Sequence, residues 1–137
     1  MGAAGFEVVE HTADWALRVW GSDLGVLFKQ AALGMGFLMV GDLTAVALQI
    51  NRNLNLQAFD REDLLVEWLS ELVYCAESEY LIFRQFDIHT ISDTALKATL
   101  TGDKVTQIDK DIKAVTYHNL AIAETAVGLE TTIVFDV

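Results

Sequence analysis

The sequence predicts an α+β fold in which two helices pack on a largely antiparallel β-sheet. Two stretches repeat apolar residues at helical spacing, and most of the remainder alternates apolar and polar residues as strands do. With 137 residues, 53% of them hydrophobic, the chain suffices for one domain with a proper core but not for two. We therefore expect a single compact domain over residues 1–137, with both helices on one face of the sheet.

Two strands are expected before the first helix. Residues 6–9 are rich in β-formers, and residues 15–20 alternate aliphatic with polar or aromatic side chains. The junction between them holds His11, Thr12 and Asp14. Strand junctions often carry function, but Thr12 and Asp14 could equally form a turn through side-chain to backbone hydrogen bonds. These residues alone leave both interpretations open.

The first helix is predicted to follow a turn and cap at residues 21–23. Gly34 and Gly36 weaken its last turns, which indicates either close packing or a loosened end. Its apolar positions at helical spacing are Leu24, Leu27, Phe28, Ala31, Met35, Leu38 and Met39.

A long strand or pair of strands is expected over residues 44–58, where even positions are apolar and odd ones polar. Arg52 is the exception and indicates a break, a bulge or an edge position. Asp60 then caps a second helix whose broad apolar stripe contains Trp68 as a core residue. Cys75 lies beside this stripe, and we expect a buried, inert thiol there.

The rest of the chain reads as β-structure around an exposed loop at residues 102–111. Strands are expected over residues 81–91, 94–101, 112–123 and 129–137. Strand periodicity in the third of these would place Lys113 and His118 on opposite faces. An ordinary edge strand could contain both residues without any function.

Charge and composition limit the classes of partner. Nine basic residues and a net charge of -11 disfavour direct nucleic-acid binding, because a phosphate-binding surface needs clustered lysine and arginine. An acidic surface suits a basic protein patch or a divalent cation, although acidity more often only confers solubility.

No membrane or export signal is evident in the sequence. The apolar run at residues 31–41 is about half the ~20 residues that a spanning helix requires. The first residues lack the basic start of a secretion signal, and a single cysteine offers no internal disulfide. We expect a cytoplasmic protein with no membrane association.

Two anions meet at the end of the sequence, the side chain of Asp136 and the α-carboxylate of Val137. A lysine or a hard divalent cation can offset such a pair, and ligands with oxygen donors alone favour calcium or magnesium over zinc. If the last strand lies beside Asp14, three anionic oxygen donors converge. The alternative is a frayed terminus in solvent.

Four segments together resemble the archease family. They are His-Thr-Ala-Asp at residues 11–14, Trp-Leu-Ser-Glu-Leu at 68–72, Ile-Lys-Ala-Val-Thr-Tyr-His at 112–118 and Phe-Asp-Val at 135–137. The resemblance implies a compact α+β fold with a metal site formed by the two ends of the chain. It also implies a non-enzymatic role, as protein cofactor of the RtcB-type RNA-splicing ligase, promoting guanylylation and multiple turnover of the ligase in tRNA splicing.

The resemblance also implies which residues form the site. Asp14, Asp136 and Val137 would bind the metal, with calcium the first expectation and magnesium the second. Lys113 would join Asp14 and Asp136 in activating the partner, with His11 and His118 in support. The chain departs from common family patterns at residues 107–109 and at Asn119, where details of the partner surface would differ. The sequence leaves the oligomeric state open.

Two other functions compete with this one. A hydrolase or transferase would use His118 with Asp14 or Cys75, but the sequence has no Gly-x-Ser-x-Gly nucleophile elbow. A chaperone-like modulator of tRNA-modifying enzymes would use exposed apolar surface at residues 37–40 instead of the metal-binding end.

Overall fold

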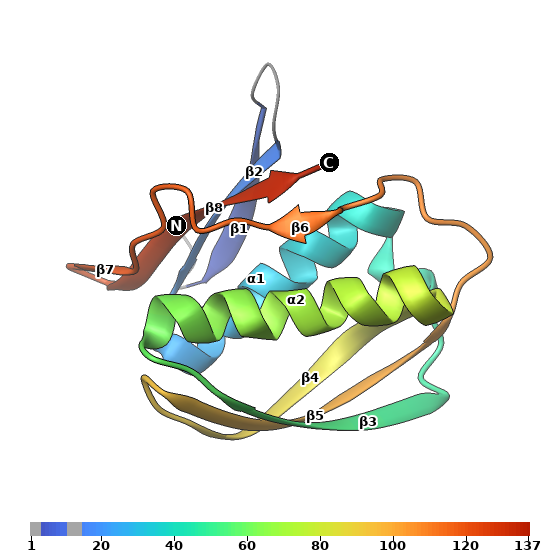
Figure 1. Ribbon diagram of the computed structural model, residues 1–137, viewed down its shortest axis with the longest axis horizontal. Helices are drawn as coiled ribbons and strands as arrows, with labels where there is room; N and C mark the ends of the chain where they lie inside the picture. Colours follow the sequence, from blue (N-terminus) through green and yellow to red (C-terminus); the bar gives the residue numbers. More distant parts are fainter. Residues whose placement is uncertain (1–3, 11–14) are drawn as a thin grey trace.

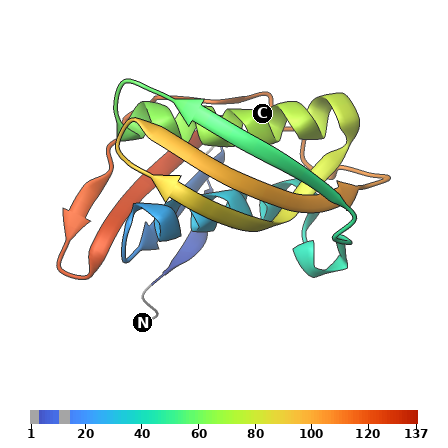
Figure 2. The ribbon, with the colours of Figure 1, turned by 90° about the horizontal axis from the view of Figure 1, so that it is seen from below.

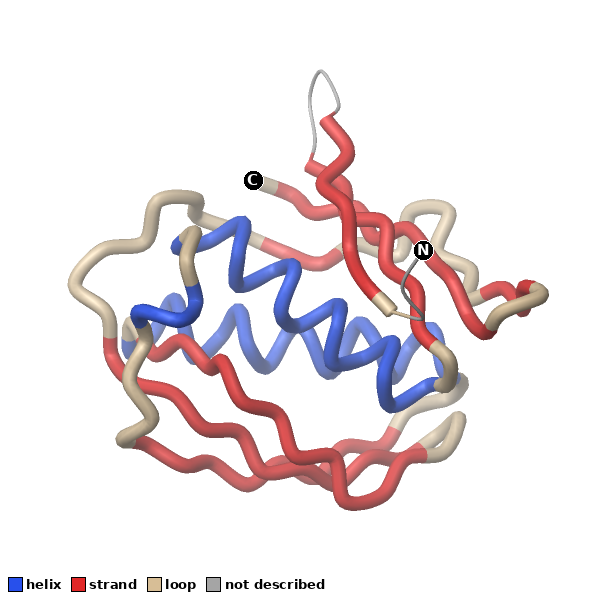
Figure 3. The backbone as a smooth tube through the Cα atoms, turned by 180° about the vertical axis from the view of Figure 1, so that it is seen from behind, coloured by secondary structure: helices blue, strands red, loops and turns tan. Residues whose placement is uncertain are grey.

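The two helices form a layer between two antiparallel sheets, seen from opposite sides in Figures 1 and 3. The computed structural model describes residues 4–10 and 15–137. In chain order its elements are β1 (Gly5–Glu10), β2 (Trp15–Gly21), α1 (Leu24–Val40), the 3-10 helix η1 (Leu43–Ala45), β3 (Ile50–Gln57), α2 (Arg61–Glu79), β4 (Leu81–Ile91), β5 (Ala95–Lys104), β6 (Ala114–Val115), β7 (Ala123–Thr125) and β8 (Gly128–Asp136).

The strands divide into two sheets. The first has the order β1-β2-β8-β6, with β7 also paired to β8, and the second has the order β3-β5-β4. Figure 2 shows the second sheet from below, with its strands crossing α2 at an angle. The α+β class, the two helices and the antiparallel pairing are confirmed. The helices are, however, covered on both sides instead of lying on one face of a single sheet.

α1 is apolar on almost every side because both sheets cover it. Asp23 caps its start by accepting a hydrogen bond from the Val26 amide at 2.9 Å. Gly34 and Gly36 mark close packing and not a loosened end: a Cβ at Gly34 would lie 2.6 Å from Leu17 of β2, and one at Gly36 would lie 3.0 Å from Leu43. The glycines let α1 approach β2 on one side and η1 on the other.

α2 carries the central aromatic residue of the core. Asp60 accepts a hydrogen bond from the Asp63 amide at 2.8 Å and starts the helix. Trp68 is fully buried, as expected, and its indole Nε1–H donates to the backbone oxygen of Phe28 at 2.9 Å. Its ring packs against the rings of Phe28 in α1 and Phe86 in β4. One side chain thus joins both helices to the second sheet.

Two predicted strands are shorter than expected. The stretch at residues 44–58 becomes a strand only at Ile50, because Asp42 caps the short helix η1 and accepts hydrogen bonds from the Thr44 amide and hydroxyl. Arg52 lies in regular register opposite Leu100 on the edge strand β3, and it pairs with Glu79 of α2 at 2.8 Å. The edge interpretation of this position is therefore correct.

The predicted strand at residues 112–123 is wrong over most of its length. Within that range only Ala114–Val115, which form β6, and Ala123, the first residue of β7, are in strands, and a turn lies between them. Side chains at the start of α2 hold the segment that follows this turn through two hydrogen bonds. Glu62 accepts one from the Ile122 amide at 2.8 Å, and Arg61 donates one to the Ile122 carbonyl at 2.7 Å. β-propensity cannot reveal such contacts with a distant helix.

Neither helix in the described part of the chain has the length and apolar character that a membrane-spanning segment needs.

We predict that Gly34→Ala destabilises the protein although alanine favours helices. The new methyl group would press on Leu17, which is fully buried, so we expect a loss of about 1–3 kcal/mol in the free energy of unfolding. Gly25→Ala in the same helix is the matched control, since its nearest neighbour would be 3.5 Å away. That variant should be neutral or gain up to about 1 kcal/mol in urea unfolding. Equal effects from both variants would contradict the packing argument.

Candidate functional site

The last strand brings the chain end next to the start of β2. In the central strand β8, Phe135 pairs with Trp15 of β2, and Asp136 pairs with Ala114 of β6. Phe135 is fully buried, and Asp136, one position on, is exposed. Figure 1 shows the C-terminus beside the end of β2 that begins at Trp15. The carboxylate of Asp136 therefore lies on the outside of the first sheet.

Lys113 lies immediately before β6 and next to Asp136 of β8. Its backbone amide donates to the Asp136 carbonyl at 2.8 Å, and Thr116 extends the pairing through its amide to the Val134 carbonyl at 3.0 Å. Both Lys113 and Asp136 are exposed. Neither side chain makes a hydrogen bond or ion pair with another described residue. The structure thus presents an available ammonium and an available carboxylate from neighbouring backbone positions.

Asp14 and His11 lie outside the described residues, so their predicted roles stay predictions. Within residues 4–10 and 15–137, no three histidine, cysteine, aspartate or glutamate side chains gather as metal ligands. Asp136 and the adjoining Val137 supply oxygen donors of the kind that hard divalent cations prefer. The Asp136 side chain is exposed, so this carboxylate is accessible as an oxygen donor.

Residues 105–113 form a strap over the ends of both helices. The Val105 amide donates to the carbonyl of Tyr80 at the end of α2, and the Asp109 and Lys110 amides donate to the Met39 carbonyl near the end of α1. The Lys110 ammonium lies 4.0 Å from the ring centroid of Trp15. The loop predicted at residues 102–111 begins only at Val105, because β5 continues to Lys104, and the loop is held at both helices and at β2. The sequence offers no signal for Lys110, because this contact joins distant positions.

His118 lies in the turn docked on α2 and not on a strand opposite Lys113. Tyr117 donates its hydroxyl to Asp63 at 2.6 Å and anchors the turn. His118 is exposed, and among the described residues it interacts with its neighbours Thr116 and Asn119. The expected opposite-face arrangement is wrong because this anchor draws the chain out of the sheet after Thr116.

The Tyr117–Asp63 contact shifts the protonation of both groups. The hydrogen bond to Asp63, with burial and nearby acids, raises the pKa of Tyr117 to about 12. The same bond, with the Phe59 amide as second donor, lowers the pKa of Asp63. Both shifts favour the state in which the hydroxyl keeps its proton and the carboxylate stays charged.

The described residues show neither a His118–Cys75 pair nor a continuous apolar surface at residues 37–40, and the alternative pair of His118 with Asp14 involves a residue outside them. Burial first and Glu71 second raise the pKa of the Cys75 thiol, which disfavours a nucleophilic thiolate. Cys75 also lies about 18 Å along α2 from Asp63, which holds the turn containing His118. At residues 37–40, Leu38 and Met39 are buried and only Phe37 is strongly exposed. The expected apolar surface is therefore largely part of the core.

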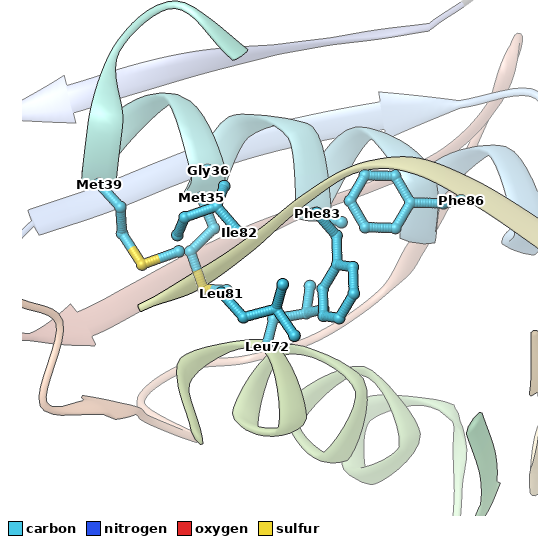
Figure 4. Close-up of a pocket in the computed structure, with 9 residues that line it drawn as sticks. Met35, Gly36, Met39, Leu72, Leu81, Ile82, Phe83 and Phe86 are labelled. Atoms are coloured by element: carbon cyan, nitrogen blue, oxygen red, sulfur yellow. The ribbon is translucent and has the colours of Figure 1, made fainter. Parts of the chain in front are cut away.

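A small apolar void beneath α1 is a packing feature and not a ligand site. Figure 4 shows its lining, which comes from α1, α2 and β4 and includes Met35, Leu72 and Phe83. Its volume is about 10 Å³, at the lower limit for one water molecule. Without polar side chains around it, the void offers nothing to orient a ligand.

The family model of the archease protein family (MTH1598/TM1083) matches residues 6–137. This chain belongs to the archease family. The match extends from β1 to the strand that carries Asp136, so it includes every element of the site. The resemblance seen in four short segments is confirmed over nearly the whole chain.

Relatives and solved structures agree with this membership. The chain is 34% identical to protein archease of Methanosarcina mazei, with 96% of this chain and 95% of that protein covered. It is 36% identical to protein archease of Saccharolobus islandicus, with 96% and 98% covered. The solution structure of Methanobacterium thermoautotrophicum protein 1598 aligns with a TM-score of 0.79 at 28% identity, covering 97% of this chain and 99% of that one.

A crystal structure from Thermotoga maritima supports the fold alone. That protein is described as an archease and possible chaperone, and it aligns with a TM-score of 0.66 at 22% identity, covering 96% of each chain. Both solved structures have the fold found here. The archease fold is therefore shown independently of the local motifs.

We predict that Tyr117 stabilises the site turn within a defined pH window. Its folded pKa lies above the ordinary 10.0, so its contribution is present below pH 10 and is lost as the pH rises towards 12. Asp63 has a lowered pKa, so its contribution is present above 3.8 and is lost as the pH falls below that value. Tyr117→Phe should lower the melting temperature at neutral pH and remove a tyrosine that titrates near 12 in ultraviolet absorbance. Tyr74→Phe, a change at an exposed tyrosine, is the control.

Proposed function

We propose that this archease is a non-catalytic activator of an RtcB-type RNA-splicing ligase, which promotes guanylylation and multiple turnover of that enzyme in tRNA splicing. The supporting observation is the adjacency of Asp136 in β8 and Lys113 immediately before β6, which are joined by a backbone hydrogen bond and whose side chains are both exposed and unengaged among the described residues. Family membership over residues 6–137 supports the same role. We place its action in the cytoplasm, without direct binding of nucleic acid.

The shape of the surface supports action on a protein and not on a small substrate. Lys113 borders an open groove of about 240 Å³, and the Asp136 side chain projects outward from the sheet. Enzymes usually enclose most of a small substrate in a concave apolar pocket. An exposed ammonium and an exposed carboxylate can instead enter the active site of a partner and add charge there.

A divalent cation is the second part of this proposal. Asp136, Val137 and Asp14 would hold calcium or, as the second choice, magnesium through carboxylate oxygens. When bound, the cation would supply positive charge that neutralises phosphate oxygens. Lys113, whose backbone is hydrogen-bonded to that of Asp136, would supply a further positive charge nearby. His11 and His118 are proposed as supporting groups.

We predict that Lys113→Ala abolishes most of the multiple-turnover activation of a cognate ligase. The change removes an exposed ammonium and no described side-chain contact, so the melting temperature should change little. Lys97→Ala, which removes another exposed lysine from β5, is the matched control. Full activation by Lys113→Ala would exclude this lysine from the mechanism. A wild-type protein without any effect on the ligase would contradict the proposed function itself.

We predict that Asp136→Asn weakens binding of calcium and magnesium at least about tenfold in isothermal titration, because a charged oxygen ligand is lost. Asp87→Asn, on the second sheet, should bind as the wild type does. A C-terminal extension converts the Val137 carboxylate into an amide and should weaken binding in the same way. Unchanged affinity in the extended protein would leave Asp136 to act without Val137.

A further inference from the structure

A groove runs along the second half of α2, between that helix and residues 108–115. It consists of two hollows of about 240 and 280 Å³, which share Glu77. The first is bordered by Tyr74 and Lys113, and the second by Tyr80 and Asp111. Figure 1 shows the segment that leads into β6 passing beside this end of α2. The groove therefore joins the end of α2 to the Lys113 site.

The second hollow has the lining that an arginine side chain requires. Ala76 and Ile108 supply apolar surface for the aliphatic stem, and Tyr80, a residue that is 50% exposed, supplies an aromatic ring. Glu77 and Asp111 supply two exposed carboxylates, which can accept the parallel N–H groups of a guanidinium. Neither carboxylate has a hydrogen-bond or ion-pair partner among the described residues.

Tyr80 occupies its position against a local backbone preference. It ends α2 with a φ of 54° in the left-handed region, where glycine or asparagine is the usual residue. Bulky residues rarely adopt this conformation, because Cβ comes too close to the following carbonyl oxygen. Tyr80 is nevertheless an exposed residue, so packing in the core does not account for its presence there.

We propose that this hollow binds an arginine side chain on a segment of the partner protein, which for the proposed function is the ligase. Asp111 lies in the hollow at the Tyr80 end and Lys113 in the other hollow, and Glu77 borders both. An arginine bound at the Tyr80 end would orient the partner segment so that it continues towards Lys113 and Asp136. A net charge of -11 favours basic protein surfaces over nucleic acid as the occupant.

The experiment separates docking from activation in the complex of full-length protein and cognate ligase. Glu77→Gln with Asp111→Asn removes both charges but keeps the side-chain shapes. We expect the variant to bind the ligase about tenfold or more weakly than the wild type at low salt. The difference in affinity between the two proteins should become smaller as the salt concentration rises. Activation at saturating concentration should equal that of the wild type. Asp87→Asn with Asp93→Asn, the same charge change at exposed positions on the far sheet, should have no effect.

Tyr80→Asn distinguishes a role of the Tyr80 side chain in binding from a role in stabilising the end of α2. Asparagine tolerates the left-handed conformation, so the variant should melt at the wild-type temperature or above, yet bind the ligase more weakly. If the charge-neutral pair and Tyr80→Asn both bind like the wild type, the arginine site is wrong while the proposed function stands. If the wild type binds the ligase but does not activate it, the proposed function fails and the binding comparison still decides the docking site. If the wild type does not bind the ligase at all, both proposals are overturned.

Discussion

Coverage of the helix pair from both sides is the constraint on which the rest of the structure depends. A helix that is packed on two faces has to be apolar over most of its circumference, as α1 is, and neighbouring strands have to come close to its backbone. Gly34 meets that requirement towards β2, and Trp68 joins the two helices to β4. The indole N–H of Trp68 finds its acceptor in the backbone of Phe28, so the largest core side chain leaves no buried donor unpaired.

This layered core fixes the place of the candidate site without containing it. β8 is buried on its inner side through Ile133 and Phe135 and pairs with β2 and β6 at its two edges. Its outward side can then carry Asp136 at no cost to the core. Lys113 reaches the same place because the strap at residues 105–113 is held to the ends of α1 and α2. Rigid backbone thus supports exposed polar groups, an arrangement suited to binding a partner.

The sequence predicts those features that depend on local chemistry. Asp23 and Asp60 start the two helices as expected, and the apolar stripe of α2 identifies Trp68 as a core residue. The neighbourhood of Lys113 and Asp136 was predictable through the family resemblance and is shown by their backbone hydrogen bond. The participation of Asp14, Asp136 and Val137 in a metal site stays a prediction.

Features that depend on distant contacts could not be predicted from the sequence. Alternation of apolar and polar residues indicates which side chains are buried, but it does not indicate which of two sheets a strand joins. The segment at residues 112–123 has strand-like composition, yet contacts with Glu62 and Asp63 hold much of it as a turn on α2. Lys110 has no periodic pattern around it, and only the folded chain brings it over Trp15.

The central position of β8 has a consequence for biosynthesis. It is the last strand of these elements to leave the ribosome, yet it fills the space between β2 and β6. Until it arrives, β2 has an unpaired edge, and closing the sheet requires contacts between segments far apart in sequence, which form slowly. Asp136 is carried by that same strand, so a nascent chain, or one shortened before β8, cannot present Lys113 and Asp136 side by side. The candidate site can therefore form only after the first sheet has closed.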